Sequence, residues 1–237
     1  RIEKTSSEKL LGLVINNKLS WKEHLYGDED NPGLISQLKQ RLGTLKRLSK
    51  HMSRDRLKMM VSGIFYSKLM YCLPVFGNVH GLDIYRDTKG RSSGMTIIDC
   101  NKLQVLQNSV NRLITGARQG TATADLLENT KSLSVQQMIA FYTLIMVHKI
   151  TMTGKPDYLA KRLSLRQENL RELRGWGGRT VETPDYSLET SRAGFVYRGG
   201  RLYNSLSRNL REEMAISKFK EGVKKWVKDK IPVRPAR

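Results

Sequence analysis

The chain has 237 residues, of which 39% are hydrophobic, and its 42 Lys and Arg against 22 Asp and Glu give a net charge of +20. This length and composition predict a folded chain with its own core, and exclude a disordered or disulfide-rich small protein. A cation excess of this size predicts a polyanionic partner, for which nucleic acid is the commonest candidate.

The first residues predict a small β element. Residues 8–15 (EKLLGLVI) are almost continuously apolar, which is typical of one strand that is covered on both faces. Asn16-Asn17 predicts a turn, Ser20 the cap of a short helix, and residues 27–33 (GDEDNPG) a loop. Because burial of this strand needs neighbours, we expect the N-terminal stretch to be the least stable part of the chain.

Two amphipathic helices with a basic outer side follow from Leu34. The first has a leucine on one face at every third or fourth position. Ser53 caps the second, whose predicted buried face contains Leu57, Met60, Ile64 and Leu69. Eight basic residues face a single acid, Asp55, between Leu34 and Lys58. These are Lys39, Arg41, Lys46, Arg47, Lys50, Arg54, Arg56 and Lys58. Intrahelical salt bridges cannot explain so many unbalanced cations, so we predict that they contact phosphates without reading sequence.

The remaining chain is predicted to be helical with two polar loops. Residues 74–98 form the first loop, and Asp99 caps a helix that ends at Gly116. Thr123 begins a short helix, and Val135–Ile150 is apolar nearly all round, which is typical of a central bundle helix.

The C-terminal region begins with the second loop, residues 175–192. Phe195–Tyr197 is predicted as a short strand, and Ser217 as the cap of a final helix with six lysines. The predicted fold class is therefore mainly α, a multi-helix bundle with a small N-terminal β element. The expected segments are 1–33, basic helices 34–77, a linker 78–98, a helical bundle 99–174, and a loop plus basic helix 175–237.

Sites for catalysis, metals and membranes are not indicated. The four histidines and the two cysteines, Cys72 and Cys100, lack the spacing of a zinc site, and they favour a reducing intracellular compartment, nucleus or cytoplasm. The acids of Asp28–Asp30 and the glycines of 175–178 are expected in plain surface loops. The longest apolar run, Met138–Val147, is too short to span a bilayer, so no membrane partner is expected.

Several stretches, in order, resemble the part of non-LTR (LINE-type) retrotransposon reverse transcriptases that follows the polymerase active site. The strongest is KLLGLVINNKLSWKEHL, residues 9–25, through Leu11, Gly12, Leu19, Ser20, Trp21 and His24. The others are YSKLMYCLPVFG (66–77), LQNSVNRLITGAR (106–118), HKITMTGKPDYL (148–159), RLYNSLSRNLRE (201–212) and Phe219-Lys220. The resemblance thus covers nearly the whole chain.

This resemblance implies a function for the basic helices. The first strand would be the end of the palm, with Leu11 and Gly12 near the primer end, and the basic helices would be the thumb that holds an RNA–DNA duplex. Such enzymes bind Mg²⁺ through palm aspartates, two of them adjacent, but no Asp-Asp pair occurs here. The expected chain is a fragment that binds RNA, DNA or their hybrid, needs no cofactor of its own and does not polymerise. Its partners would include the missing palm and fingers of the same polyprotein, and the first residue, Arg1, is consistent with a piece of a longer protein.

Three alternatives stay open at this point. The chain could be a stand-alone basic helical RNA-binding protein, or a helical interaction module for an acidic protein partner. It could also be a decayed genomic copy, which keeps its sequence pattern for some time. The sequence decides neither between RNA and DNA nor the oligomeric state.

Overall fold

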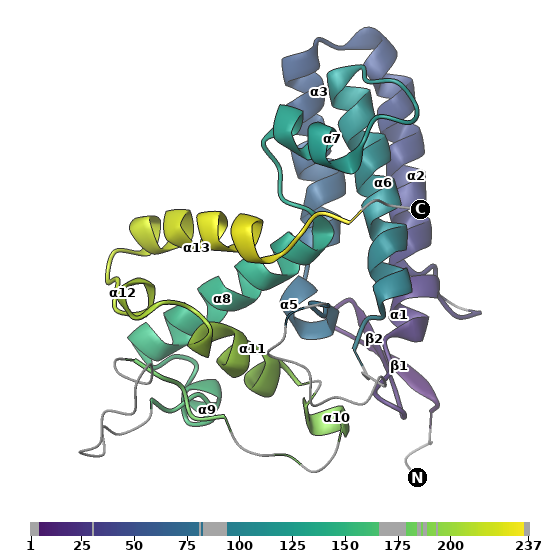
Figure 1. Cartoon of the computed structure of the whole chain (residues 1–237). Coiled ribbons are helices and arrows are strands. Elements are labelled where there is room, and N and C mark those ends of the chain that lie inside the picture. The colour runs from purple at the N-terminus through teal and green to yellow at the C-terminus, as the bar shows by residue number, and fades with distance from the viewer. Residues whose placement is uncertain are drawn as a thin grey trace. The chain divides into compact units, whose positions relative to one another are not determined.

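The computed structural model describes residues 5–29, 31–80, 82, 94–165, 179–183, 186, 189–192 and 194–234. These residues are mainly helical with one small antiparallel sheet, which confirms the predicted fold class (Figure 1). The chain divides into two compact units. Unit 1 contains Arg1–Phe76, Ser93–Gln136 and Val233–Arg237, and unit 2 contains Gly77–Ser92 and Gln137–Pro232. The helical segment predicted at 99–174 therefore contributes to both units.

Unit 1 begins with the hairpin strands β1 (Ser7–Leu10) and β2 (Leu13–Asn16). Its helical elements are α1 (Lys22–Tyr26), α2 (Leu34–Leu48), the 3-10 turn η1 (Ser49–His51), α3 (Arg54–Val61), the π-helical turn η2 (Ser62–Tyr66), α4 (Ser67–Met70), α5 (Leu73–Phe76), α6 (Ile97–Thr115) and α7 (Thr123–Thr130). Unit 2 contains most of α8 (Val135–Thr153), then α9 (Asp157–Ala160), α10 (Glu189–Arg192), α11 (Phe195–Asn204), α12 (Arg208–Arg211) and α13 (Ile216–Lys230).

The prediction of one buried strand over residues 8–15 is wrong. Leu11 (φ 48°) and Gly12 (φ 81°) both have positive φ, so they form a two-residue turn that folds the segment into a hairpin with Leu10 opposite Leu13. β1 is mostly exposed, and the Leu11 side chain is 82% exposed. Only β2 contributes to the core, through Leu13 and Val14.

The buried face of the second basic helix is also different from the prediction. Leu57, Val61, Phe65 and Leu69 are each at most 3% exposed, whereas Met60 and Ile64 are only half-buried. In an α-helix, side chains four residues apart differ in direction around the helix axis by about 40°. The difference between Leu57 and Leu69 would therefore be roughly 120°. The π-turn η2 absorbs this difference because it places more residues in one turn.

Two predicted helix caps are corrected. Trp21, and not Ser20, occupies the N-cap of α1, and Ser20 instead accepts a hydrogen bond from Asn16 Nδ2 at 2.7 Å. Thr96 is the N-cap of α6, and Asp99 lies three residues later, where both halves of a capping box form. Gly116 ends α6 in the left-handed conformation, as predicted.

One side of α6 carries a buried network of side-chain amides. Gln104 donates to Gln107 Oε1 at 2.9 Å and to Asn108 Oδ1 at 3.0 Å, and Gln107 donates to the carbonyl of Leu133 at 2.7 Å. Asn108 donates to Thr123 Oγ1 at 2.8 Å, at the start of α7. The Tyr66 hydroxyl of η2 donates to Asn111 Oδ1 at 3.0 Å. These bonds connect η2, α6, α7 and the connection before α8.

The core of unit 2 is built by α8, α11 and α13. The His148 ring of α8 stacks on Phe219 of α13, with ring centroids 3.7 Å apart, and its Nδ1 lies 3.1 Å from the Tyr203 hydroxyl of α11. The predicted strand at Phe195–Tyr197 is wrong, because these residues begin α11. The final helix begins at Ile216 with Ala215 as its N-cap, so the predicted cap Ser217 lies inside the helix.

One described segment, Arg54–Phe76, is long and apolar enough to cross a membrane by length and composition. Four of its apolar side chains, Leu57, Val61, Phe65 and Leu69, are core residues of unit 1. Its exposed side includes the polar residues Ser62 and Ser67. This arrangement is typical of a core helix that is amphipathic rather than uniformly apolar.

Candidate nucleic-acid interface

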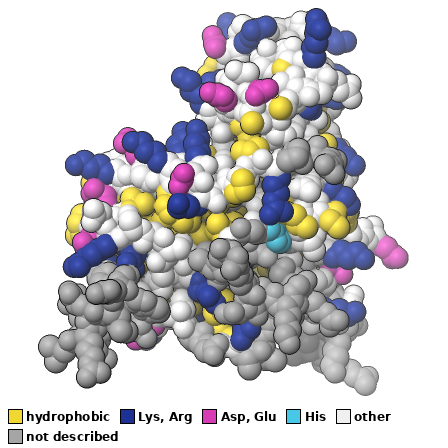
Figure 2. Space-filling model, in the orientation of Figure 1, with side chains coloured by type: hydrophobic (Ala, Val, Ile, Leu, Met, Phe, Trp, Pro, Cys, Tyr) yellow, Lys and Arg dark blue, Asp and Glu magenta, His cyan; other side chains and the backbone are white. Residues whose placement is uncertain are grey.

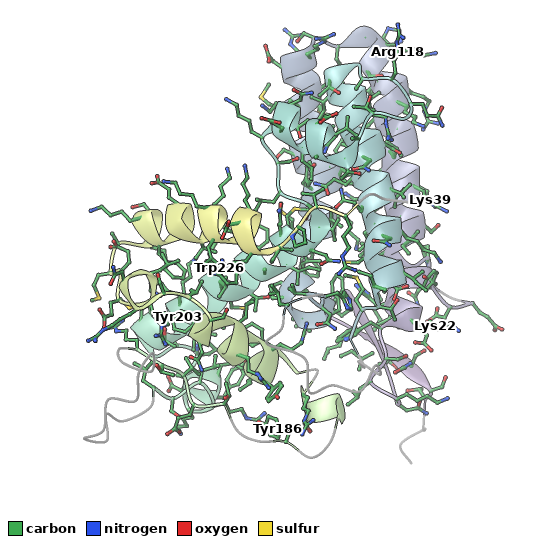
Figure 3. The ribbon with its side chains drawn as sticks, viewed as in Figure 1. Lys22, Lys39, Arg118, Tyr186, Tyr203 and Trp226 are labelled. Carbon is green, nitrogen blue, oxygen red and sulfur yellow. The ribbon has the colours of Figure 1, made fainter. Side chains whose placement is uncertain are left out.

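Six of the eight predicted phosphate-binding cations gather where α2 meets α3. This α2–α3 corner consists of Lys46, Arg47, Lys50, Arg54, Arg56 and Lys58, and all six side chains are exposed. Figure 2 shows Lys and Arg side chains over the end of unit 1 at which Figure 1 places the start of α3. The C-terminal end of α6 lies at the same place, because Arg54 Nη2 is 3.4 Å from where a Cβ on Gly116 would be. Exposed Arg118 follows there (Figure 3).

No ion pair neutralises the corner within the described part of the chain. None of its six cations forms a salt bridge with a described carboxylate, although Asp55 lies within the same segment. Arg47 makes one weak contact, from Nη2 to Thr44 Oγ1 at 3.4 Å. The corner therefore presents its positive charge to solvent.

Helix electrostatics explains some of these cations and not others. Lys46 and Arg47 are in the last turn of α2, where the helix dipole favours positive charge. Arg54 and Arg56 are in the first turn of α3, where the dipole disfavours positive charge by about 0.3–1 kcal/mol per residue. Ser53 at the N-cap makes no capping hydrogen bond from its side chain. Local helix stability therefore does not account for the two arginines.

The other two predicted cations face different neighbours. Arg41 is half-buried, and its Nη1 donates to the carbonyl of Ile64 at 2.5 Å, inside the π-turn. Burial, followed by the charges of Arg41 and Lys9, lowers the pKa of Lys68, so these three cations lie near one another. Lys39 is exposed midway along α2 and lines a pocket against α6 (Figure 3).

Leu11 and Gly12 lie at the opposite end of α2 from the corner. They form the hairpin turn, and the Tyr71 hydroxyl donates to the carbonyl of Leu11 at 2.6 Å, which fixes the turn against the end of α4. The 15 residues of α2 separate the hairpin side from the corner by about 22 Å. The predicted site residues are thus spread over unit 1 and do not form one compact site.

The sequence stretches that carry the family resemblance meet in the cores. Trp21 and His24 of the first stretch pack on Phe76 of the second, with ring centroids 6.1 and 4.9 Å apart. Tyr66 of the second stretch bonds to Asn111 of the third. In unit 2, His148, Tyr203 and Phe219 come from the three remaining stretches. These stretches therefore mostly build the fold, although they also contain exposed cations such as Lys22 and Arg118.

His24 is a structural residue in this arrangement. It is 6% exposed, and its Nδ1 accepts a hydrogen bond from the Val14 amide at 3.4 Å, so the ring is neutral. Burial, with a smaller contribution from the charge of Lys68, lowers its pKa to about 4. Among the described residues, no three His, Cys, Asp or Glu side chains gather closely enough to hold a metal ion.

Sequence reasoning missed the cations that other elements contribute. Arg112 lies in α6 among apolar and amide residues, and Arg118 follows the end of that helix. Only the packing of α6 beside α2 brings these two cations near the corner. Two predicted surface features, Asp30 and the glycine-rich residues 175–178, lie outside the described residues.

Comparison with known proteins gives no match, either among protein-family models or among curated proteins and solved structures.

Proposed function

We propose that the chain is a nucleic-acid-binding fragment equivalent to the thumb and following region of a non-LTR retrotransposon reverse transcriptase. It holds a template–primer duplex through backbone phosphates, and the α2–α3 corner is its main contact. The chain has no adjacent aspartate pair, so the catalytic palm would come from elsewhere in the same polyprotein.

One observation carries this proposal. The corner places six exposed cations without a carboxylate partner among the described residues, and two of them oppose the dipole of their own helix. Unpaired cations at a cost to helix stability are expected where binding, and not folding, requires them. Phosphate contacts of this kind give affinity that depends strongly on salt and weakly on sequence.

The test is fluorescence anisotropy of a labelled RNA–DNA hybrid, titrated with the full chain at several salt concentrations. The variant changes three corner residues, Lys46, Arg47 and Lys50, to Ala. A matched control changes three exposed lysines of α13, Lys220, Lys224 and Lys228, to Ala, which removes the same charge from unit 2. Duplex DNA and single-stranded RNA, titrated in parallel, measure the preference between nucleic acids.

We expect the affinity of the wild type to fall steeply with salt. The corner variant should bind more weakly, with a salt slope shallower by roughly one unit for each phosphate that the protein no longer neutralises. The α13 control should change less. Equal binding by the wild type and the corner variant would overturn the assignment of the corner, and absence of binding by the wild type would overturn the proposed function.

A further inference from the structure

Two pockets lie in line between α2 and α6 on one face of unit 1, and together they are called the α2–α6 groove. Tyr26, Ile35, Lys39, Ile98 and Lys102 are among the residues that line a pocket of about 540 Å³ at one end. Lys46, Ser109 and Arg112 line a second pocket, of about 360 Å³, farther along the same helices. Ile35 and Ile98 share the first pocket, and Lys46 and Ser109 share the second. The two residues of each pair have the same separation in sequence. The two helices therefore run in parallel, side by side (Figure 1).

The lining residues lie on one continuous face of each helix. On α6 they recur as Ile98, Lys102, Val105, Ser109 and Arg112, at spacings of four and three, which keeps them on one side. From the first to the last of these, α6 rises about 21 Å at 1.5 Å per residue. This length corresponds to about four turns of a helix lying in the groove.

The floor of this α2–α6 groove is apolar and part of its rim is exposed. Ile35 and Leu106 are buried at the floor, whereas Ile98 is 63% exposed and Val105 is 41% exposed on the rim. Tyr26 closes one end, where its ring is held beneath Lys102 Nζ at 4.5 Å from the centroid. Large apolar side chains exposed together beside a concave surface are typical of a protein-binding site.

Cations stand on both sides of the groove. Lys39 and Lys46 come from α2, and Lys102 and Arg112 come from α6. The described residues that line the two pockets include no carboxylate. The nearby Asp99 is buried, and it is bonded to the Thr96 cap and the Tyr26 hydroxyl. The groove thus combines an apolar floor with positive charge on both walls.

We infer that the α2–α6 groove binds an acidic amphipathic helix of a protein partner. Apolar side chains of that helix at positions i, i+3, i+4 and i+7 fill the floor between Ile98 and Val105. Carboxylates on its two flanks pair with the lysines of the two walls. A nucleic acid would instead place phosphates or sugars on Ile98 and Val105, and neither gains from an exposed isoleucine or valine. This site is separate from the corner, although Lys46 belongs to both.

The test uses a fluorescein-labelled synthetic peptide of about 15 residues, long enough for four helical turns. Leucines occupy one face, glutamates flank them, and alanines fill the other positions. A control peptide has the same composition with the leucines spread around the helix. The protein variant changes Ile98 and Val105 to Ser. A matched variant changes two exposed methionines outside the groove, Met59 and Met214, to Ser. Neither variant alters the charge of the protein.

We expect the amphipathic peptide to bind the wild type and the Met59→Ser/Met214→Ser variant alike, and the groove variant at least tenfold more weakly. The scrambled peptide should bind weakly to all three. Equal binding of both peptides, or binding that the groove variant retains, would mean attraction by net charge alone and would overturn the inference. Loss of RNA–DNA hybrid binding by the groove variant would also overturn the inference. Failure of the corner variant to affect hybrid binding would overturn only the assignment of the corner, and failure of the wild type to bind the hybrid would overturn only the proposed function.

Discussion

Unit 1 has 20 Lys and Arg against 10 Asp and Glu, and unit 2 has 22 against 12, so the two units carry the same net charge. They use it differently. In unit 2, Arg198 and Arg211 are buried, with 7% and 3% of each residue exposed, and Arg208 pairs with Glu212 at 2.8 Å. In unit 1 six cations are exposed at one corner without an ion pair in the described part of the chain. Net charge alone therefore does not locate a binding surface. Pairing and burial narrow the choice to the corner and the exposed lysines of α13, which the binding control compares.

The two cores also differ in the kind of polar or aromatic contact that they contain. Unit 1 encloses four side-chain amides of α6 in a network of directional bonds, and unit 2 encloses the stacked rings of His148 and Phe219. A hydrogen-bonded core is destabilised more than a stacked core when one partner is removed, because buried polar groups are then left unsatisfied.

The largest expected effect on stability comes from substitutions that compare these two cores directly. Gln107→Leu removes bonds to the Leu133 carbonyl and to Gln104, so we expect unit 1 to be destabilised by about 2–3 kcal/mol. His148→Phe keeps the stacking on Phe219 and removes only the hydrogen bond with Tyr203, which should destabilise unit 2 by about 1 kcal/mol. Urea denaturation with hydrogen exchange assigned to each unit measures both. A larger effect of His148→Phe would reverse the comparison.

Acid is expected to have an effect of comparable size, centred on the hairpin of unit 1. The pKa of His24 is about 4 in the folded chain against 6.5 for free histidine, so the unfolded state binds more protons between these values. Stability therefore falls as the pH falls from about 6.5 to about 4, and residues 13–25 should become less protected from hydrogen exchange, after correction for intrinsic rates. Burial also lowers the pKa of His148, so unit 2 should respond in the same direction.

An NMR titration of the His24 ring checks this directly. We expect its signals to stay nearly unchanged above pH 5. A midpoint near 6.5 for His24 would show that the ring is not held as described.

The smallest expected effect on stability comes from a substitution at the corner that changes folding and binding in opposite directions. Arg56→Glu places a glutamate three residues after Ser53, which completes a capping box and reverses an unfavourable charge at the start of α3. We expect unit 1 to be stabilised by about 0.5–1 kcal/mol while hybrid binding weakens. Thermal unfolding and anisotropy on the same sample measure the two changes. As a control, Lys149→Glu makes the same change of charge at an exposed site of unit 2. Unchanged hybrid binding by Arg56→Glu would contradict a role for the corner.

Much of the fold could be predicted from periodicity, and the failures have physical reasons. The leucines of α2 and the apolar length of α8 are regular helical signals, and both helices form where they were expected. The hairpin was missed because an apolar run does not show where φ becomes positive, and Leu11 is an unusual residue for such a turn. The amides of α6 were missed because Gln and Asn are usually exposed.

The candidate site could be predicted only in part. The unbalanced charge of residues 34–58 identified the corner cations, since these are neighbours in sequence. Arg41 differs from the others because its carbonyl partner, Ile64, is 23 residues away and is available only in the π-turn. Lys102 and Arg112 enter the α2–α6 groove through packing between two helices that are distant in the chain, Leu34–Leu48 and Ile97–Thr115. Packing at that distance leaves no local pattern in the sequence.

The π-turn has a consequence for the gene as well as for the protein. A π-turn contains one residue more than an α-helical turn, so η2 is equivalent to a single inserted codon. Deleting the codon for Gly63, which has no neighbour within 4 Å of its Cβ position, would restore an uninterrupted α-helix. The eleven steps that would remain between Leu57 and Leu69 turn an α-helix by about 1,100°, within about 20° of three full turns, so Leu69 would stay on the core face. The reading frame would be intact and the two halves of one helix would stay aligned, so the loss of a single codon would remove the π-turn without moving the core face.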